Sequence, residues 1–170
     1  MHMILIYPGT DGNRLSEYRK ALSQYEVIPF GDEKEDMTMA EIVKEAGINP
    51  GNPKGVRNPF LFFVNEDRES LSGLLSALEE NGLDCSRSAV LTENNRNWKF
   101  RDLYEAISRE AAYFAKREEL ADAVAHADPE KIRSDEQYGR IIYAFYEMLQ
   151  AEKLDEEVLD LALQTARLMK

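Results

Sequence analysis

The chain has 170 residues, of which 44% are hydrophobic and 31% charged, and its formal net charge is −11. A chain of this length buries roughly 70% of its unfolded surface on folding, so it requires no metal or disulfide for stability. Acidity is spread along the chain, with a net charge of −5 for residues 1–100 and −6 for residues 101–170. This charge argues against nucleic-acid binding, which needs clustered positive charge, and against docking on an anionic membrane.

The single cysteine, Cys85, excludes an internal disulfide and suits a reducing compartment. The first residues run directly into the apolar stretch 3–7 without the basic flank of a signal peptide. No apolar run approaches the ~20 residues that span a bilayer. We therefore expect a cytoplasmic protein.

Four apolar runs are predicted to be strands, at residues 3–7, 27–30, 60–64 and 89–91. The first run shows no alternation of apolar and polar residues, which is typical of a strand covered on both faces. Pro29 favours an edge position for the second run, because proline has no amide hydrogen to donate to a neighbouring strand.

Apolar residues at three- and four-residue spacing follow each predicted strand and indicate helices. These helices are expected at residues 15–25, 39–46, 71–78 and 103–114. Alternating strands and helices predict an α/β fold with a four-stranded parallel sheet, helices on both faces and right-handed crossovers. We expect the strand order 2-1-3-4. Residues 47–59 form the longest irregular stretch, with three prolines and three glycines.

The chain after about residue 125 contains only helical patterns. Asp128 and Pro129 indicate a helix start, and Tyr138 to Leu149 carry an apolar stripe. A last helix begins at Asp155, and we expect its packed face to consist of Val158, Leu161, Thr165 and Leu168. These features predict a sheet domain over residues 1–126 and a C-terminal helical hairpin over residues 127–170. The hairpin is expected to pack on the sheet domain or on another molecule.

One segment has a distinctive motif. Pro59-Phe60-Leu61-Phe62-Phe63 and a leucine-rich helix precede Ala89-Val90-Leu91-Thr92, which leads to Asn95, Asn97 and Trp98. Over residues 59–103, this pattern resembles a small bacterial family known only as a domain of unknown function, number three-seven-eight-three. The resemblance implies a bacterial, cytosolic protein with an α/β fold. It carries over no catalytic role, because the family has no assigned activity.

A parallel sheet would bring the loops that follow its strands to one edge, where ligands of α/β proteins usually bind. Polar and aromatic residues in these loops are the candidate ligand-binding residues: Asp11, Asn65, Asn94, Arg96, Asn97 and Trp98. Such a set suits a polar ligand with a flat face. The alternative interpretation is structural: Asn97 caps the following helix, Trp98 packs under it and Arg96 is solvated.

No pattern identifies catalytic or metal-binding residues. Gly9-Thr10-Asp11-Gly12 matches neither phosphate-binding glycine motif, and it is explained as a turn. His2 and His126 are far apart in the sequence, and a single cysteine makes no thiolate metal site. No base is indicated near Cys85. The cofactor, if there is one, stays unknown.

Two hypotheses follow. The first is a non-catalytic binding or regulatory module, whose C-terminal helices contact a protein partner or a second copy of the chain. The second is a small-molecule binder or enzyme for a polar or phosphorylated metabolite. There Arg96 would meet an anion, Asn94 and Asn97 would orient the ligand, and Trp98 would stack on it. In either case, we expect neither nucleic acid nor a membrane as a partner.

Overall fold

The structure is a computed structural model that describes residues 2–65 and 68–169. The chain divides into two compact units, Met1–Ser108 and Arg109–Lys170. The first contains a sheet with helices and is called the α/β unit; the second is called the helical unit. Helix α4 (Phe100–Ala125) contributes residues to both, so the boundary falls inside this helix, whereas the sequence predicted it after residue 126.

Four strands form the sheet of the α/β unit: β1 (Met3–Tyr7), β2 (Glu26–Pro29), β3 (Phe60–Val64) and β4 (Ser88–Val90). Their order is β2-β1-β3-β4, as predicted. Strands β1 and β3 are buried almost throughout, because helices cover both faces of the sheet.

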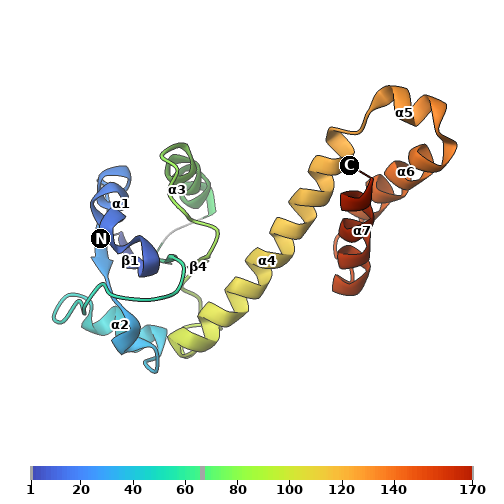
Figure 1. The fold of residues 1–170 in the computed structure, drawn as a ribbon. Coiled ribbons are helices and arrows are strands. Elements are labelled where there is room, and N and C mark those ends of the chain that lie inside the picture. The colour runs from blue at the N-terminus through green and yellow to red at the C-terminus, as the bar shows by residue number, and fades with distance from the viewer. Residues whose placement is uncertain (1, 66–67, 170) are drawn as a thin grey trace. The chain divides into compact units, whose positions relative to one another are not determined.

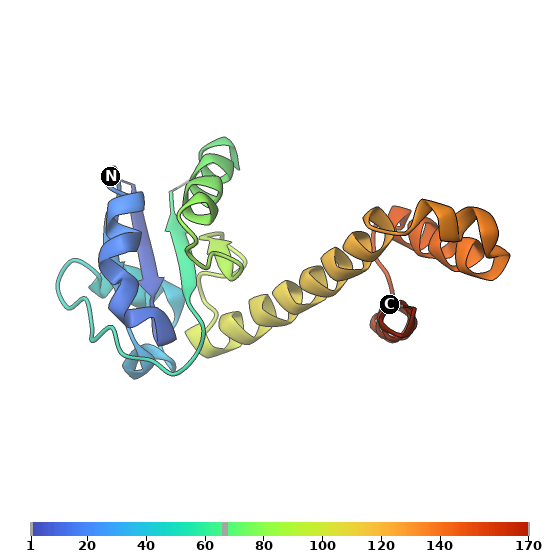
Figure 2. The ribbon, with the colours of Figure 1, turned by 45° about the horizontal axis from the view of Figure 1, so that its top comes forward.

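The predicted all-parallel sheet is wrong, because the sheet is mixed. Strand β1 pairs in parallel with β2 but antiparallel with β3, and β3 pairs in parallel with β4. Tyr7 at the end of β1 therefore lies opposite Phe60 at the start of β3. Figure 2 shows β1 and β3 side by side with opposite directions.

The path of residues 47–59 explains the reversal. This loop stays at the edge where β1 and β2 end, because its backbone is bonded to residues that follow those strands. The amide of Thr10 donates a hydrogen bond to the carbonyl of Arg57 at 2.9 Å, and the amide of Asp32 donates one to the carbonyl of Lys54 at 3.0 Å. Strand β3 thus begins at the edge where β1 ends, and it must run in the opposite direction.

Helices α1 (Leu15–Ala21) and α3 (Arg68–Glu80) cover one face of the sheet, and α2 (Met39–Glu45) covers the other with the first turns of α4 (Figure 1). Short 3-10 helices, η1 (Gly9–Arg14) and η2 (Asp32–Lys34), follow β1 and β2.

Side chains at the first turn of α2 fix where this helix begins. Thr38 and Glu41 form a capping box, in which each side chain accepts a hydrogen bond from the other residue's backbone amide.

Aromatic residues dominate the core between the sheet and the helices α2 and α4. The ring of Phe100 lies 4.9 Å from that of Phe30 and 5.2 Å from that of Tyr7, measured between centroids. On the other face, Leu74 and Leu78 of α3 are buried as the leucine spacing predicts. The two cores hold the strand ends in place on both faces.

The helical unit contains the rest of α4 with α5 (Pro129–Ser134), α6 (Glu136–Gln150) and α7 (Glu156–Leu168). Asp128 caps α5 by accepting hydrogen bonds from the first-turn amides, and Asp155 caps α7 in the same way. Among the described residues, no helix combines the length and apolarity needed to cross a membrane.

The core of the helical unit joins α4, α6 and α7 around Leu120, Ile142 and Phe145. The predicted packed face of α7 is wrong. The buried residues are Leu159, Ala162, Leu163 and Ala166, whereas Val158, Leu161 and Leu168 are exposed. Helix α7 is apolar around more than one face, and the sequence alone did not show which face packs.

Candidate functional site

The edge where β1 and β2 end is occupied by the chain's own loop. The phenol of Tyr7 donates a hydrogen bond to Oδ1 of Asp32 at 2.7 Å and accepts one from the amide of Arg57 at 3.2 Å. Burial, with the hydrogen bond to Asp32, raises the pKa of Tyr7 to about 12. Arg57 forms an ion pair with Glu35 at 2.8 Å. These bonds fasten the loop over the edge where α/β proteins usually bind ligands.

Glycines permit this close approach. A Cβ atom on Gly55 would collide with the hydroxyl of Tyr7, and one on Gly31 would collide with the carbonyls of Asn52 and Lys54. The 47–59 loop therefore packs directly against the strand ends, and an open hollow between the loop and η1 is lined by Thr10, Asn13 and Lys54. Its role was missed from the sequence, although its glycine content was a signal of tight backbone contact.

The predicted ligand-binding residues do not gather at one edge. Asp11 lies in η1, just after β1. Asn65 follows β3, whose end pairs with the start of β1, so it lies at the opposite edge. Asn65 also has a positive φ of 64°, which suits a turn. The antiparallel pairing of β1 with β3 is what separates these two positions.

The loop after β4 carries the other four candidates, and its backbone caps α2. The amide of Met39 donates a hydrogen bond to the carbonyl of Trp98 at 3.0 Å. The amide of Ala40 donates one to the carbonyl of Arg96 at 2.8 Å. These two amides belong to the first turn of α2, where backbone amides have no carbonyl partner within the helix. The loop is therefore part of the framework of the α/β unit.

The side chains of this loop are mostly exposed. Arg96 is paired with Glu93 at 2.9 Å, and Trp98 is 44% exposed. Asn94 and Asn97 are exposed. A different asparagine, Asn95, fixes the turn by accepting from the amide of Thr92 and donating to the carbonyl of Val90.

Cys85 is buried beside α3. Burial raises the pKa of its thiol to about 11, and the neighbouring carboxylates of Glu79 and Asp84 act in the same direction. A thiol of this kind is a poor nucleophile at neutral pH, because the reactive species is the thiolate.

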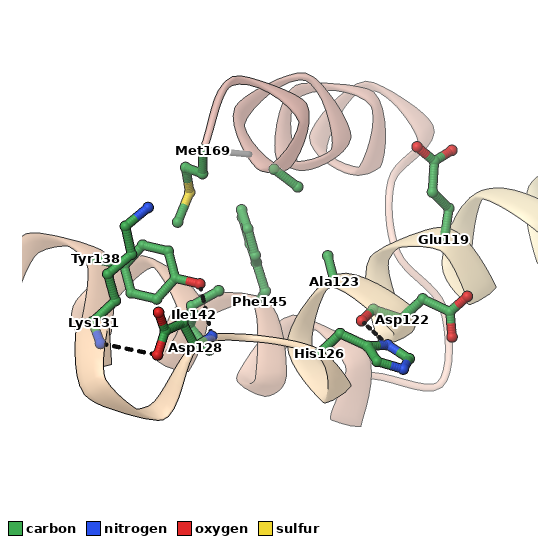
Figure 3. A pocket seen from close by; sticks show the side chains of 11 residues that line it. Glu119, Asp122, Ala123, His126, Asp128, Lys131, Tyr138, Ile142, Phe145 and Met169 are labelled. Carbon is green, nitrogen blue, oxygen red and sulfur yellow. Dashed lines mark hydrogen bonds between the residues drawn. The ribbon is translucent and has the colours of Figure 1, made fainter. Parts of the chain in front are cut away.

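The helical unit contains a pocket of about 440 Å³ between α4, α6 and the end of α7 (Figure 3). Its floor is apolar, and Phe145 points into it from α6. Its rim is mostly charged and consists of Glu119, Asp122, His126, Asp128 and Lys131. A pocket with an apolar floor and a charged rim suits an elongated group that is apolar along its length and charged at its end.

Several rim groups already have partners within the unit. Arg167 donates two hydrogen bonds of 2.8 Å to the carboxylate of Glu119. Asp128 accepts the amides of α5, and the ammonium of Lys131 lies 5.2 Å from the ring centroid of Tyr138. The ring of His126 is bonded to the backbone carbonyl of Asp122 at 3.0 Å. The Asp122 carboxylate, by contrast, extends away from Phe145 (Figure 3).

The exposed apolar side chains of α7 form a second feature, which we call the outer stripe: Val158, Leu161 and Leu168. Leu161 is 64% and Leu168 82% exposed. On α6, Tyr143 and Tyr146 are also exposed, with their ring centroids 6.5 Å apart. Each of these helices thus has an apolar surface wider than the part that the core covers.

In the described part of the chain, no cluster of three or more His, Cys, Asp or Glu side chains is arranged to hold a metal ion.

The comparisons with known proteins identify one segment. Residues 59–114 match the family model of DUF3783, a domain of unknown function. The match confirms the resemblance seen in the sequence, and it covers β3, α3, β4 and the first half of α4. The DUF3783 segment therefore includes the loop with Arg96 and Trp98 but neither α6 nor α7. No curated protein and no solved structure matches the chain.

Proposed function

We propose that the chain is a non-catalytic binding module whose helical unit binds another polypeptide. The observation that supports this function is the outer stripe of α7. Val158, Leu161 and Leu168 recur at helical spacing on one side of the helix, and all three are exposed. Single exposed apolar residues are ordinary, whereas a stripe of them marks an interaction surface.

The chemistry of the stripe fits protein recognition. Covering apolar surface contributes about 25 cal/mol for each Å² removed from water. Leucine and valine offer no hydrogen-bonding groups for a polar metabolite, but they suit the apolar face of a helix laid along a groove. The exposed tyrosines of α6, Tyr143 and Tyr146, are of the residue type that is enriched in interfaces.

The alternative, a small-molecule site on the loops of the α/β unit, stays a prediction with less support. Asp11 and Asn65 lie at opposite edges of the sheet, and the 47–59 loop covers the edge near Asp11. Arg96 and Trp98 are the residues that would test it. Loss of ligand binding in Arg96→Ala, with unchanged stability, would support it.

Site-specific photo-crosslinking tests the proposed function. A photoreactive amino acid replaces Leu161 in the full chain, and the protein is irradiated in a lysate of the cells that produce it. We expect a discrete crosslinked product that disappears when Leu168→Asp is added. The control carries the same group at Ser23, an exposed position of the α/β unit. Equal crosslinking from Ser23, or none from Leu161, would contradict the proposal.

A further inference from the structure

We propose that the polypeptide bound at the outer stripe is an amphipathic helix with basic flanks, contributed by a different protein. This inference rests on the proposed function and specifies its partner.

The helical unit is acidic. Residues 109–170 carry nine lysines and arginines against fourteen aspartates and glutamates, a net charge of −5. Several of the basic side chains are already paired inside the unit. Lys116 lies 2.6 Å from Asp160, and Arg167 lies 2.8 Å from Glu119. The field that meets an approaching partner is therefore negative.

Acidic residues also border the apolar surface itself. Glu157 stands four residues before Leu161, so the two side chains are neighbours on α7. On α6, Glu147 stands four residues after Tyr143, and a hydrogen bond with Glu147 raises the pKa of that tyrosine. A partner that covers the apolar residues would place its flanks against these carboxylates, where lysine or arginine is favoured.

The outer stripe and the pocket lie on different sides of α7. Leu161 and Leu168 are exposed, whereas Ala162 and Ala166 are buried in the core, and Ala166 lines the pocket. The partner is therefore argued from the stripe and the carboxylates beside it.

A second copy of this chain is a less suitable occupant. It would bring the same net charge of −5 in its own helical unit to the interface. Carboxylates such as Glu157 would then face like charges, which opposes association.

The test uses the full chain and a synthetic fourteen-residue peptide of leucine and lysine, with its leucines on one helical face. Binding is measured by fluorescence anisotropy at moderate salt. We expect saturable binding that weakens at least tenfold in Leu161→Asp. The matched control, Gln164→Asp, adds the same charge one turn along α7 but keeps the leucine, and it should bind the peptide at least as well as the original chain.

Three comparisons distinguish failure of this inference from failure of the proposed function. A scrambled peptide of the same composition must bind at least tenfold more weakly, because equal binding would indicate unspecific charge attraction and overturn the inference. Equal binding of a leucine–glutamate peptide would overturn the basic partner but leave the docking surface. A dimer in sedimentation that Leu161→Asp dissociates would identify a second copy as the occupant.

Absence of binding by every peptide would overturn the inference, and crosslinking from Leu161 would then decide the proposed function separately. Circular dichroism checks that Leu161→Asp is folded. If it is not, Leu168→Ser replaces it, because Leu168 is 82% exposed.

Discussion

The phenol of Tyr7 donates a hydrogen bond to the carboxylate of Asp32 at 2.7 Å, although the two residues stand 25 positions apart in the sequence. The same hydroxyl accepts the amide of Arg57, which is 50 positions away. One buried hydroxyl thus joins the end of β1, the start of η2 and the 47–59 loop.

Replacing Tyr7 with phenylalanine should destabilise the α/β unit by about 1–3 kcal/mol, because the Arg57 amide loses its acceptor in a partly buried place. Urea denaturation measures the change in the free energy of unfolding. Tyr146→Phe is the control, since Tyr146 is exposed, and it should change stability by no more than about 0.5 kcal/mol. Equal effects of the two variants would show that the Tyr7 hydroxyl has no special role.

Gly55→Ala should destabilise the protein by about 1–3 kcal/mol, because the added methyl group would collide with the Tyr7 hydroxyl in a packed core. Gly47→Ala is the matched control in the same loop. A Cβ atom there meets open space among the described residues, so its effect on the melting temperature should be small. A neutral Gly55→Ala would mean that the loop moves away from Tyr7 at little cost.

Asp155→Ala should lower the stability of the helical unit by about 1 kcal/mol, because the Asp155 carboxylate accepts the amides of Glu157 and Val158 at the start of α7. Helical circular dichroism during heating reports the change. Gln164→Ala, at an exposed position later in the same helix, should leave the transition nearly unchanged. A similar loss in both variants would argue against the cap.

Cys85 should react slowly with iodoacetamide. Its pKa is raised from 9.0 to about 11, so the folded thiol stays protonated at pH values where an unfolded thiol is already a thiolate. A raised thiol pKa also stabilises the folded state below pH 9, and this contribution is lost between pH 9 and about 11. Alkylation rates are measured against pH in buffer and in urea. Coincident profiles would contradict the buried environment of this thiol.

The strand order was predictable, whereas the strand directions were not. Pro29 placed β2 at an edge, and the continuous apolar run Phe60–Val64 placed β3 in the interior. A strand that is buried on both faces has an unbroken apolar pattern whichever way it runs, so this pattern does not indicate parallel or antiparallel pairing. The direction of β3 depends instead on long-range bonds such as that between Thr10 and Arg57.

The placement of the candidate residues was predicted less well for the same reason. The expectation that Asp11, Asn65 and Arg96 share an edge depended on parallel strands. The outer stripe was found in the sequence as a face of α7, since Val158, Leu161 and Leu168 have helical spacing. Its exposure was not predictable, because the neighbouring residues Leu159, Ala162 and Leu163 form an equally apolar face, and only packing decides between the two.

The position of β1 in the sheet has a consequence for synthesis. Strand β1 is the first element of the described chain, yet it lies between β2 and β3. A growing chain pairs β1 on one side once residues 26–29 have emerged, but the other side stays open until residues 60–64 follow. Open strand edges favour wrong pairing with other chains. We therefore expect fragments that end before β3 to aggregate, and folding of the α/β unit to wait for the 47–59 loop and β3 to leave the ribosome.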